Sequence, residues 1–153
     1  MLAQPQGLRW GIRIGRFWFQ KRSFSPLPLL ALIVLLPPEF NPSRLVTAIP
    51  VLAIVLSECL RLWAVGYAGS STRTRSDTVP KLVSMGPYLH VRNPLYIANI
   101  IMYTACTILF GFKILSLLTF LYSCIQYTFI VQYEEELLTR LFGTSYLTYL
   151  NTV

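Results

Sequence analysis

The chain has 153 residues and carries 13 Lys and Arg side chains against 6 Asp and Glu, which gives a formal net charge of +7. Hydrophobic residues make up 54% of the chain and charged residues only 12%, whereas soluble domains carry about 25% charged residues. This composition excludes a disordered chain and argues against a water-soluble globule. The length allows one domain with a few membrane helices, and no large catalytic domain outside the membrane.

The first 25 residues predict an amphipathic helix at the membrane surface. Arginines at positions 9, 13 and 16 recur at helical spacing, and Trp10, Ile14 and Phe17 line a neighbouring face. The segment has neither the apolar core nor the cleavage site of a secretory signal. We therefore expect residues 1–25 to form an interfacial segment and residues 26–153 to form one membrane domain. A flexible basic leader is the alternative interpretation of residues 1–25.

Four apolar runs follow, and they predict an all-α, polytopic membrane helix bundle with about four spans. The runs cover residues 26–36, 45–67, 95–112 and 114–133. The first run stops at Pro37-Pro38 and is short, because a span takes about 20 residues, so it either tilts through the membrane or enters only partly. The last two runs are separated only by Gly111-Phe112-Lys113, which predicts a tight helical hairpin.

The second run contains two opposite charges. Glu58 and Arg61 are three positions apart and therefore share one helical face. Charges at this depth are costly unless they are paired. We expect a structural ion pair, and a role in contacting a ligand is the alternative.

The remaining reactive residue types argue against a disulfide framework and against a metal site. The three cysteines, Cys59, Cys106 and Cys124, lie in apolar runs and are odd in number, so we expect unpaired, buried side chains. His90 is the only histidine, and there is no Cys/His cluster. The Lys and Arg residues fall at the ends of apolar runs, which is typical of membrane proteins rather than of nucleic-acid-binding proteins.

The basic residues also predict the orientation. Five precede the first run and five more lie from Arg61 to Arg92, whereas the alternate loops hold only Arg44 and Lys113. Loops rich in Lys and Arg stay on the cytoplasmic side. We therefore expect the N-terminus, the 68–93 loop and the C-terminus to be cytoplasmic.

Two polar segments are the candidate site. In the 68–93 loop, Gly86-Pro87 predicts a turn, and Arg92 lies beside the helix start near Asn93, where backbone N–H groups favour an anion. The other segment begins with Glu134, Glu135 and Glu136, which we expect to open a cytoplasmic helix over residues 134–150. Together with Tyr88 and Tyr96, these groups suit a zwitterionic small molecule that carries an aromatic ring.

Each piece has a simpler interpretation when it is taken alone. Arg92 could be a cation at the membrane interface, and three glutamates after a span could be a solvated helix start. Tyr146 and Tyr149 could belong to an aromatic belt at the interface. The joint order and spacing of the two segments, on either side of a helical hairpin, favour one shared site.

The joint pattern LVSMGPYLHVRNPLY and YEEELLTRLFGTSYLTYL resembles the isoprenylcysteine carboxyl methyltransferase and phospholipid methyltransferase superfamily, over roughly residues 55–150. The resemblance implies an integral membrane enzyme with a cytoplasmic cofactor pocket. Such an enzyme moves a methyl group from S-adenosylmethionine to a lipophilic acceptor, either an isoprenylcysteine-like carboxylate or a lipid head group. Its implied partners are that lipophilic or prenylated substrate and the membrane lipid, without nucleic acid or metal.

The resemblance also implies roles for individual residues. Arg92 and Glu135 are the catalytic candidates. The cofactor-binding candidates are Pro80, Lys81, Leu82, Val83, Tyr88, Asn93, Pro94, Leu95, Tyr96 and Glu134. Eukaryotic members carry a substrate-binding Arg four residues before the Glu, where this chain has Ile130.

Two other functions remain open at the level of the sequence. Membrane sterol-type reductases, which use a nicotinamide cofactor, share a similar Arg-x-Pro-x-Tyr stretch. They continue with Gly-Glu soon after the Tyr, whereas Tyr96 is followed by Ile97-Ala98-Asn99. The third possibility is a non-catalytic membrane protein of the same fold.

Overall fold

The computed structural model describes residues 6–38, 44–69, 79 and 81–153, and among these residues it contains helices and no strand. The helices are α1 (Gln6–Lys21), α2 (Leu27–Leu35), α3 (Arg44–Ala68), the short 3-10 helix η2 (Gly86–Leu89), α4 (Pro94–Leu109), α5 (Lys113–Phe142) and α6 (Thr144–Thr152). The predicted all-helical bundle is confirmed.

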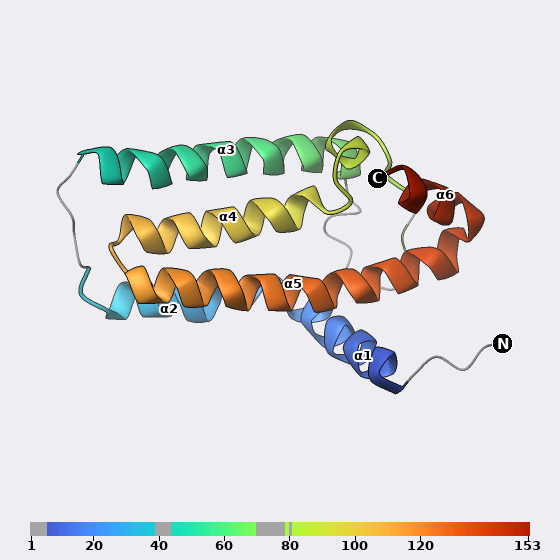
Figure 1. Cartoon of the computed structure of the whole chain (residues 1–153), viewed down its shortest axis with the longest axis horizontal. Coiled ribbons are helices and arrows are strands. Elements are labelled where there is room, and N and C mark those ends of the chain that lie inside the picture. Colours follow the sequence, from blue (N-terminus) through green and yellow to red (C-terminus); the bar gives the residue numbers. More distant parts are fainter. Residues whose placement is uncertain (1–5, 39–43, 70–78, 80) are drawn as a thin grey trace.

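The four helices α2, α3, α4 and α5 run in alternate directions along the long axis of the molecule (Figure 1). Helix α4 packs against both α3 and α5, and α1 packs against α5. The turn between α4 and α5 lies at one end of the bundle, whereas η2, α6 and the C-terminus lie at the other end (Figure 1). This arrangement brings the two polar segments of the sequence to the same end.

Helix α1 lies within the segment predicted over residues 1–25, of which the structure describes residues 6–25. Trp10, Ile14 and Phe17 are exposed on it, whereas Phe19 is buried against α5. The close approach of α1 to α5 depends on glycine, because a Cβ atom at Gly15 would overlap the backbone carbonyl oxygen of Phe129. One face of α1 therefore packs against α5, and the other face is exposed on the surface of the protein.

The first apolar run does not form a full span by itself. Helix α2 has nine residues, so it is about 14 Å long, whereas the hydrocarbon layer is about 30 Å thick. Pro26 precedes the helix and Leu36 already has extended backbone angles. The helical part of this run is therefore too short to cross the hydrocarbon layer by itself.

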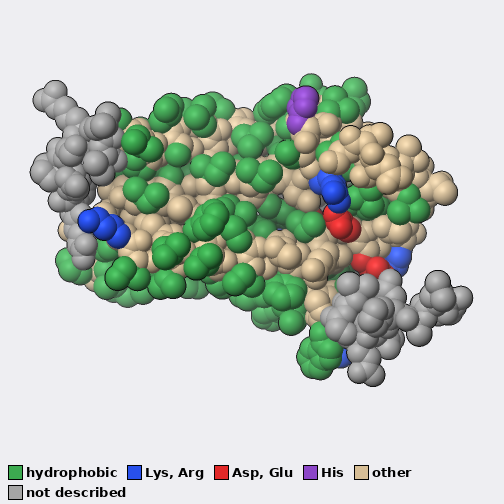
Figure 2. All heavy atoms as spheres, viewed as in Figure 1, with side chains coloured by type: hydrophobic (Ala, Val, Ile, Leu, Met, Phe, Trp, Pro, Cys, Tyr) green, Lys and Arg blue, Asp and Glu red, His purple; other side chains and the backbone are tan. Residues whose placement is uncertain are grey.

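Two described helices are long and apolar enough to cross a membrane, Thr47–Ala68 and Lys113–Phe142, and Pro94–Leu109 is a shorter apolar helix. Only 17% of the most apolar stretch of α3 is buried inside the protein. Its outward face carries large apolar side chains such as Leu52, Leu56 and Trp63, and hydrophobic side chains are spread along the length of the bundle in Figure 2. Soluble proteins rarely expose an apolar surface of this extent to water, so these helix faces suit contact with lipid.

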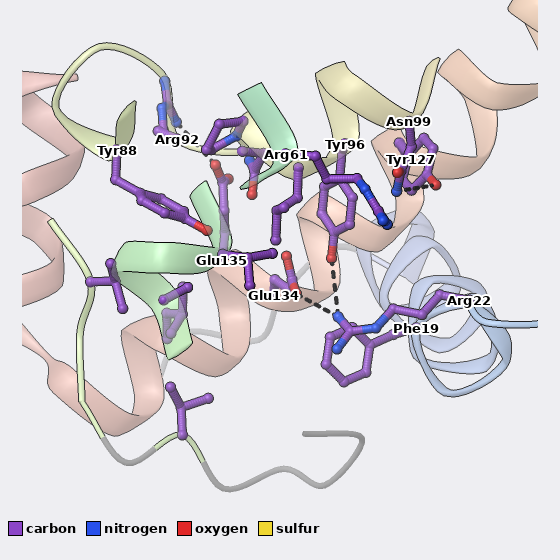
Figure 3. A pocket seen from close by; sticks show the side chains of 18 of the residues that line it. Phe19, Arg22, Arg61, Tyr88, Arg92, Tyr96, Asn99, Tyr127, Glu134 and Glu135 are labelled. Atoms are coloured by element: carbon purple, nitrogen blue, oxygen red, sulfur yellow. Dashed lines mark hydrogen bonds and ion pairs between the residues drawn. The ribbon is translucent and has the colours of Figure 1, made fainter. Parts of the chain in front are cut away.

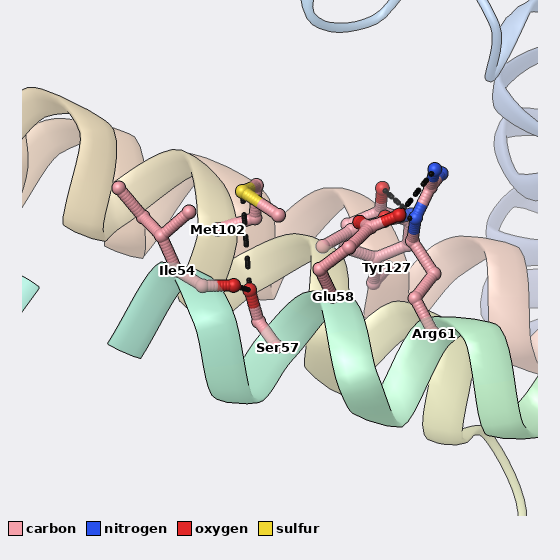
Figure 4. A network of polar contacts seen from close by, with 7 residues as sticks. Ile54, Ser57, Glu58, Arg61, Met102 and Tyr127 are labelled. Carbon is pink, nitrogen blue, oxygen red and sulfur yellow. Dashed lines mark hydrogen bonds and ion pairs between the residues drawn. The ribbon is translucent and has the colours of Figure 1, made fainter. Parts of the chain in front are cut away.

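Small and polar residues fill the contacts between the helices instead. Ala64 and Ala98 are almost fully buried between α3 and α4. Ser57 is also buried, and its hydroxyl donates to the carbonyl oxygen of Ile54 at 2.8 Å (Figure 4). Small residues and internally bonded hydroxyls at helix contacts are typical of membrane bundles.

The ion pair predicted in the second run is confirmed. Arg61 donates to Glu58 through Nε at 2.9 Å and through Nη2 at 3.3 Å (Figure 4). The two side chains lie one helical turn apart on α3, so the pair forms within the helix and needs no partner from another element.

The cysteines are unpaired as predicted, but the expectation that they are buried is wrong. Cys59 is exposed, and Cys106 and Cys124 are partly exposed. In a membrane bundle the outer surface is itself apolar, so an apolar run places such side chains outside as readily as inside.

The helix predicted over residues 134–150 is divided differently in the structure. Helix α5 continues without interruption through the three glutamates to Phe142, and α6 begins at Thr144. Gly143, with φ of +52°, separates the two helices. The glutamates are therefore not a helix start, and Glu134 is held on a helix that continues for two further turns.

Candidate functional site

A cavity of about 620 Å³ lies at the end of the bundle where the two polar segments meet. Its walls come from α1, α3, α4, α5, α6 and the segment before η2. Eleven of the twelve predicted site residues line it: Lys81, Leu82, Val83, Tyr88, Arg92, Asn93, Pro94, Leu95, Tyr96, Glu134 and Glu135. The twelfth, Pro80, lies outside the described residues. The fold thus brings together residues that are about 40 positions apart in the sequence.

The segment around η2 is held on the bundle by a glycine turn and a tyrosine. Gly86 has φ of +63°, and a Cβ atom there would meet the ring of Tyr67 on α3. Pro87 is buried at the start of η2. The hydroxyl of Tyr149, on α6, donates to the backbone carbonyl oxygen of Tyr88 at 2.7 Å. The predicted turn at Gly86-Pro87 is confirmed, and these contacts aim the side chain of Tyr88 into the cavity (Figure 3).

Helix α4 begins at the cavity, as the sequence predicts. Asn93 is the N-cap residue, its side chain makes no capping hydrogen bond, and Pro94 is the first residue of the helix. Proline suits this position because the first N–H of a helix has no intrahelical partner. Tyr96, in the first turn, stacks on Tyr127 of α5 with ring centroids 4.6 Å apart.

Glu134 is bound by an arginine from the other end of the sequence. Arg22 lies in the turn between α1 and α2, and its Nη1 is 3.4 Å from Oε1 of Glu134 and 3.4 Å from the hydroxyl oxygen of Tyr96 (Figure 3). The guanidinium also lies 4.3 Å from the ring centroid of Phe19. Arg22 therefore joins α1, α4 and α5 at one wall of the cavity.

The two catalytic candidates form a second ion pair. Nη1 of Arg92 is 3.0 Å from Oε1 of Glu135, and both side chains are partly exposed. The cavity wall thus carries two arginine–glutamate pairs, each with one member on α5. Because each carboxylate faces a cation, polar groups of both signs are available to a ligand within a small volume.

The tyrosines of the wall are neutral hydroxyl groups. Burial, together with the charge of Glu134 and the neighbouring Tyr149, raises the pKa of Tyr88 to about 12. Burial also raises the pKa of Tyr146, assisted by the charge of Glu135, and it raises that of Tyr149, which Arg92 partly offsets. These phenols therefore stay protonated at neutral pH and can donate hydrogen bonds.

Several wall residues were not predicted from the sequence. Arg22 was counted only as a charge that sets orientation, and Phe19, Asn99 and Tyr127 were not singled out. Asn99 Nδ2 donates to the Tyr127 hydroxyl at 3.0 Å inside the wall (Figure 3). The one signal for Arg22 was its place at the end of the amphipathic segment, and periodicity alone does not say which helix that segment packs against.

Most of the other residues that the sequence analysis discussed do not line the cavity. His90 is exposed and does not line the cavity. Glu136 pairs with Arg140 on the outer side of α5 at 3.1 Å and is not part of the wall. Arg61 contributes to the wall although its partner Glu58 does not. Among the described residues no group of three His, Cys, Asp or Glu side chains could hold a metal ion.

The cavity can bind a small polar molecule that has both charges and an aromatic part. Its volume lies within the range of about 300–1,000 Å³ that ligand pockets occupy. Carboxylates accept from ammonium and hydroxyl groups, arginines donate to carboxylate or phosphate groups, and the tyrosine rings offer stacking surfaces.

Comparison with known proteins identifies the family. The model of the phospholipid methyltransferase family matches residues 43–145, well over half of the chain. No curated protein and no solved structure matches the chain significantly. The match covers the 68–93 loop, the α4–α5 hairpin and the three glutamates. It leaves out α1 and the turn after it, which supply Phe19 and Arg22 to the wall, and most of α6, which supplies Tyr146 and Tyr149. The chain, an integral membrane protein with its two motifs in one cavity, therefore belongs to the phospholipid methyltransferase family.

Proposed function

We propose that the protein is an S-adenosylmethionine-dependent methyltransferase that acts on a lipophilic acceptor at the membrane. The observation that carries the proposal is the single cavity in which both family motifs meet, lined by two arginine–glutamate pairs and six tyrosines. The family match supports methyl transfer as the reaction.

The residues of the cavity fit the chemical groups of this cofactor. S-adenosylmethionine supplies a methyl group that is already activated by its bond to a positively charged sulfur. Its amino group and ribose hydroxyls are donors, which Glu134 is suited to accept. Its carboxylate suits Arg92 and the N-terminus of α4 at Asn93, which both line the cavity. Its adenine ring suits the tyrosine-lined part of the wall near Tyr88, with Lys81, Leu82, Val83 and Leu95 around it.

The contribution of the protein is then mainly to position the acceptor and to exclude water. Holding two reactants in line supplies about 7–11 kcal/mol of the barrier lowering in favourable cases. A carboxylate acceptor needs no base, whereas an ammonium head group must first lose a proton. Glu135, which is paired with Arg92, is the candidate to receive that proton.

Titration calorimetry on the purified protein in detergent tests the proposal. We expect S-adenosylmethionine and its demethylated product to bind at one site, because both carry the amino acid and adenosine groups that the wall recognises. NADPH serves as the control and is expected to give no binding heat. Binding of NADPH without binding of S-adenosylmethionine would replace the proposal with a sterol-type reductase, and binding of neither would favour a non-catalytic protein of this fold.

A further inference from the structure

A second cavity, of about 310 Å³, lies between α2, α4 and α5. It shares Pro26 and Tyr103 with the first cavity, so the two are neighbours. Apolar side chains such as Leu29 and Leu118 form part of its wall. Helix α2 has no buried residue, so this short helix forms the wall between the cavity and the hydrocarbon of the membrane.

A stripe of polar side chains on α5 lines the second cavity, beside the apolar residues of the same helix. Thr119, Ser123 and Gln126 line it, and all three are buried. Their spacing of four and three residues places them on one face of the helix. A polar stripe directed into an otherwise apolar membrane cavity suits a ligand that carries polar atoms at the same depth.

Gln126 has one polar atom without a partner. The residue is only 2% exposed, and its Oε1 accepts a hydrogen bond of 2.8 Å from Oγ of Ser25. Its Nε2 has no hydrogen-bond partner among the residues that the structure describes. An unmade hydrogen bond on a buried amide is costly, and the hydrocarbon offers no water to replace it. The amide therefore selects for a ligand with an acceptor oxygen.

The position of Gln126 along α5 indicates which type of ligand oxygen would accept a hydrogen bond from its Nε2. Gln126 precedes Glu134 by eight residues on α5, which corresponds to about 12 Å along the helix axis. In a glycerolipid, ester carbonyl oxygens lie below the polar head group, between it and the acyl chains. A prenyl chain is pure hydrocarbon at this depth and would leave Nε2 without a partner.

We propose that the second cavity binds the ester-linked part of a glycerolipid, with Nε2 of Gln126 donating to an ester carbonyl oxygen and the apolar wall holding an acyl chain. Gln126 is then a specificity-determining residue that distinguishes ester-linked lipids from ether-linked lipids. The site goes beyond the proposed methyl transfer, because it binds the body of a lipid whether or not that lipid accepts a methyl group.

Lipid titrations followed by native mass spectrometry of the protein in detergent test this site. The two probes are phosphatidylethanolamine with ester-linked chains and its analogue with ether-linked chains of the same length. We expect the wild-type protein to bind the ester form about tenfold more tightly, the effect of one buried hydrogen bond. In Gln126→Leu the two lipids should bind equally. Gln132→Leu is the control, because Gln132 is exposed on the same helix and lines neither cavity, and it should keep the preference.

Equal affinity of the wild-type protein for the two lipids, or no binding of either, overturns the proposal even if the Gln126→Leu variant does not fold. A preference that persists in Gln126→Leu overturns it as well. Calorimetry with S-adenosylmethionine on the same preparation is independent of these titrations. If the wild-type protein binds S-adenosylmethionine but shows no preference between the two lipids, only the lipid site is contradicted. If it prefers the ester-linked lipid but does not bind S-adenosylmethionine, only the proposed function is contradicted.

Discussion

At the scale of single residues, the candidate site depends on which of three successive glutamates faces inward. Glu134 and Glu135 line the cavity and pair with Arg22 and Arg92, whereas Glu136 points away and pairs with Arg140. Successive helical positions differ by about 100°, so neighbouring side chains with the same chemistry have different surroundings. The three glutamates therefore provide a matched comparison within one variant series.

We expect Glu134→Gln to weaken the binding of S-adenosylmethionine by at least about tenfold, because a hydrogen bond to a charged group contributes about 1.5–3 kcal/mol. Glu136→Gln removes the same charge from the same helix and should leave the affinity unchanged. Calorimetric dissociation constants of the two variants check this prediction. Equal effects of the two substitutions would mean that the cluster acts only through its overall charge.

At the scale of helices, the wall of the cavity depends on how α1 packs against α5. A Cβ atom at Gly15 would overlap the backbone carbonyl oxygen of Phe129, which cannot move aside. The atom nearest to a Cβ at Gly11 would be Oε1 of Gln132, at 2.7 Å, and this is the far end of a flexible side chain. The same substitution at the two glycines should therefore have different consequences.

Gly15→Ala should lower the free energy of unfolding by about 1–3 kcal/mol, the usual effect of overpacking. It should also weaken cofactor binding, because Phe19 and Arg22 follow at the end of the same helix and line the cavity. In Gly11→Ala the side chain of Gln132 can rotate away, and alanine favours the helix over glycine by up to about 1 kcal/mol, so stability should be retained or slightly raised. Thermal unfolding in detergent and calorimetry measure both quantities; similar losses in both variants would contradict the close contact at Gly15.

At the scale of the whole molecule, the alternating direction of the helices places the candidate site and the α4–α5 turn at opposite ends (Figure 1). The acidic side chains visible in Figure 2 gather at the site end. The distribution of Lys and Arg along the sequence predicts that this end is cytoplasmic, where a soluble cofactor is available.

Cysteine labelling in sealed vesicles that expose their cytoplasmic face checks this orientation. In a background with Cys59, Cys106 and Cys124 replaced by Ser, an impermeant maleimide should label Asn151→Cys on α6. It should not label Lys113→Cys at the start of α5 until detergent opens the vesicles. Both positions are exposed in the structure, so the difference reports the membrane side. The inverse labelling pattern would place the cavity on the opposite side.

The sequence by itself determined the membrane class, the α4–α5 hairpin, the Glu58–Arg61 pair and the two motif segments. These features follow from local rules, because apolar run length, helical spacing and turn residues act over a few positions. It did not correctly predict the start of a helix at Glu134, because α5 continues through this position. Apolar composition indicates which residues can lie in lipid. The ends of a helix depend instead on the hydrogen-bond partners of its terminal N–H and C=O groups.

Only the tertiary structure decided which residues from distant segments share a wall. It placed Arg22 against Glu134 and Tyr96, put Tyr127 under Tyr96, and left one amide atom of Gln126 unpartnered in a second cavity. Such contacts depend on the side from which α1 and the following turn approach α5, which a glycine at position 15 permits. Periodicity gives a helix its faces, but the partner of each face is chosen by packing over the whole chain.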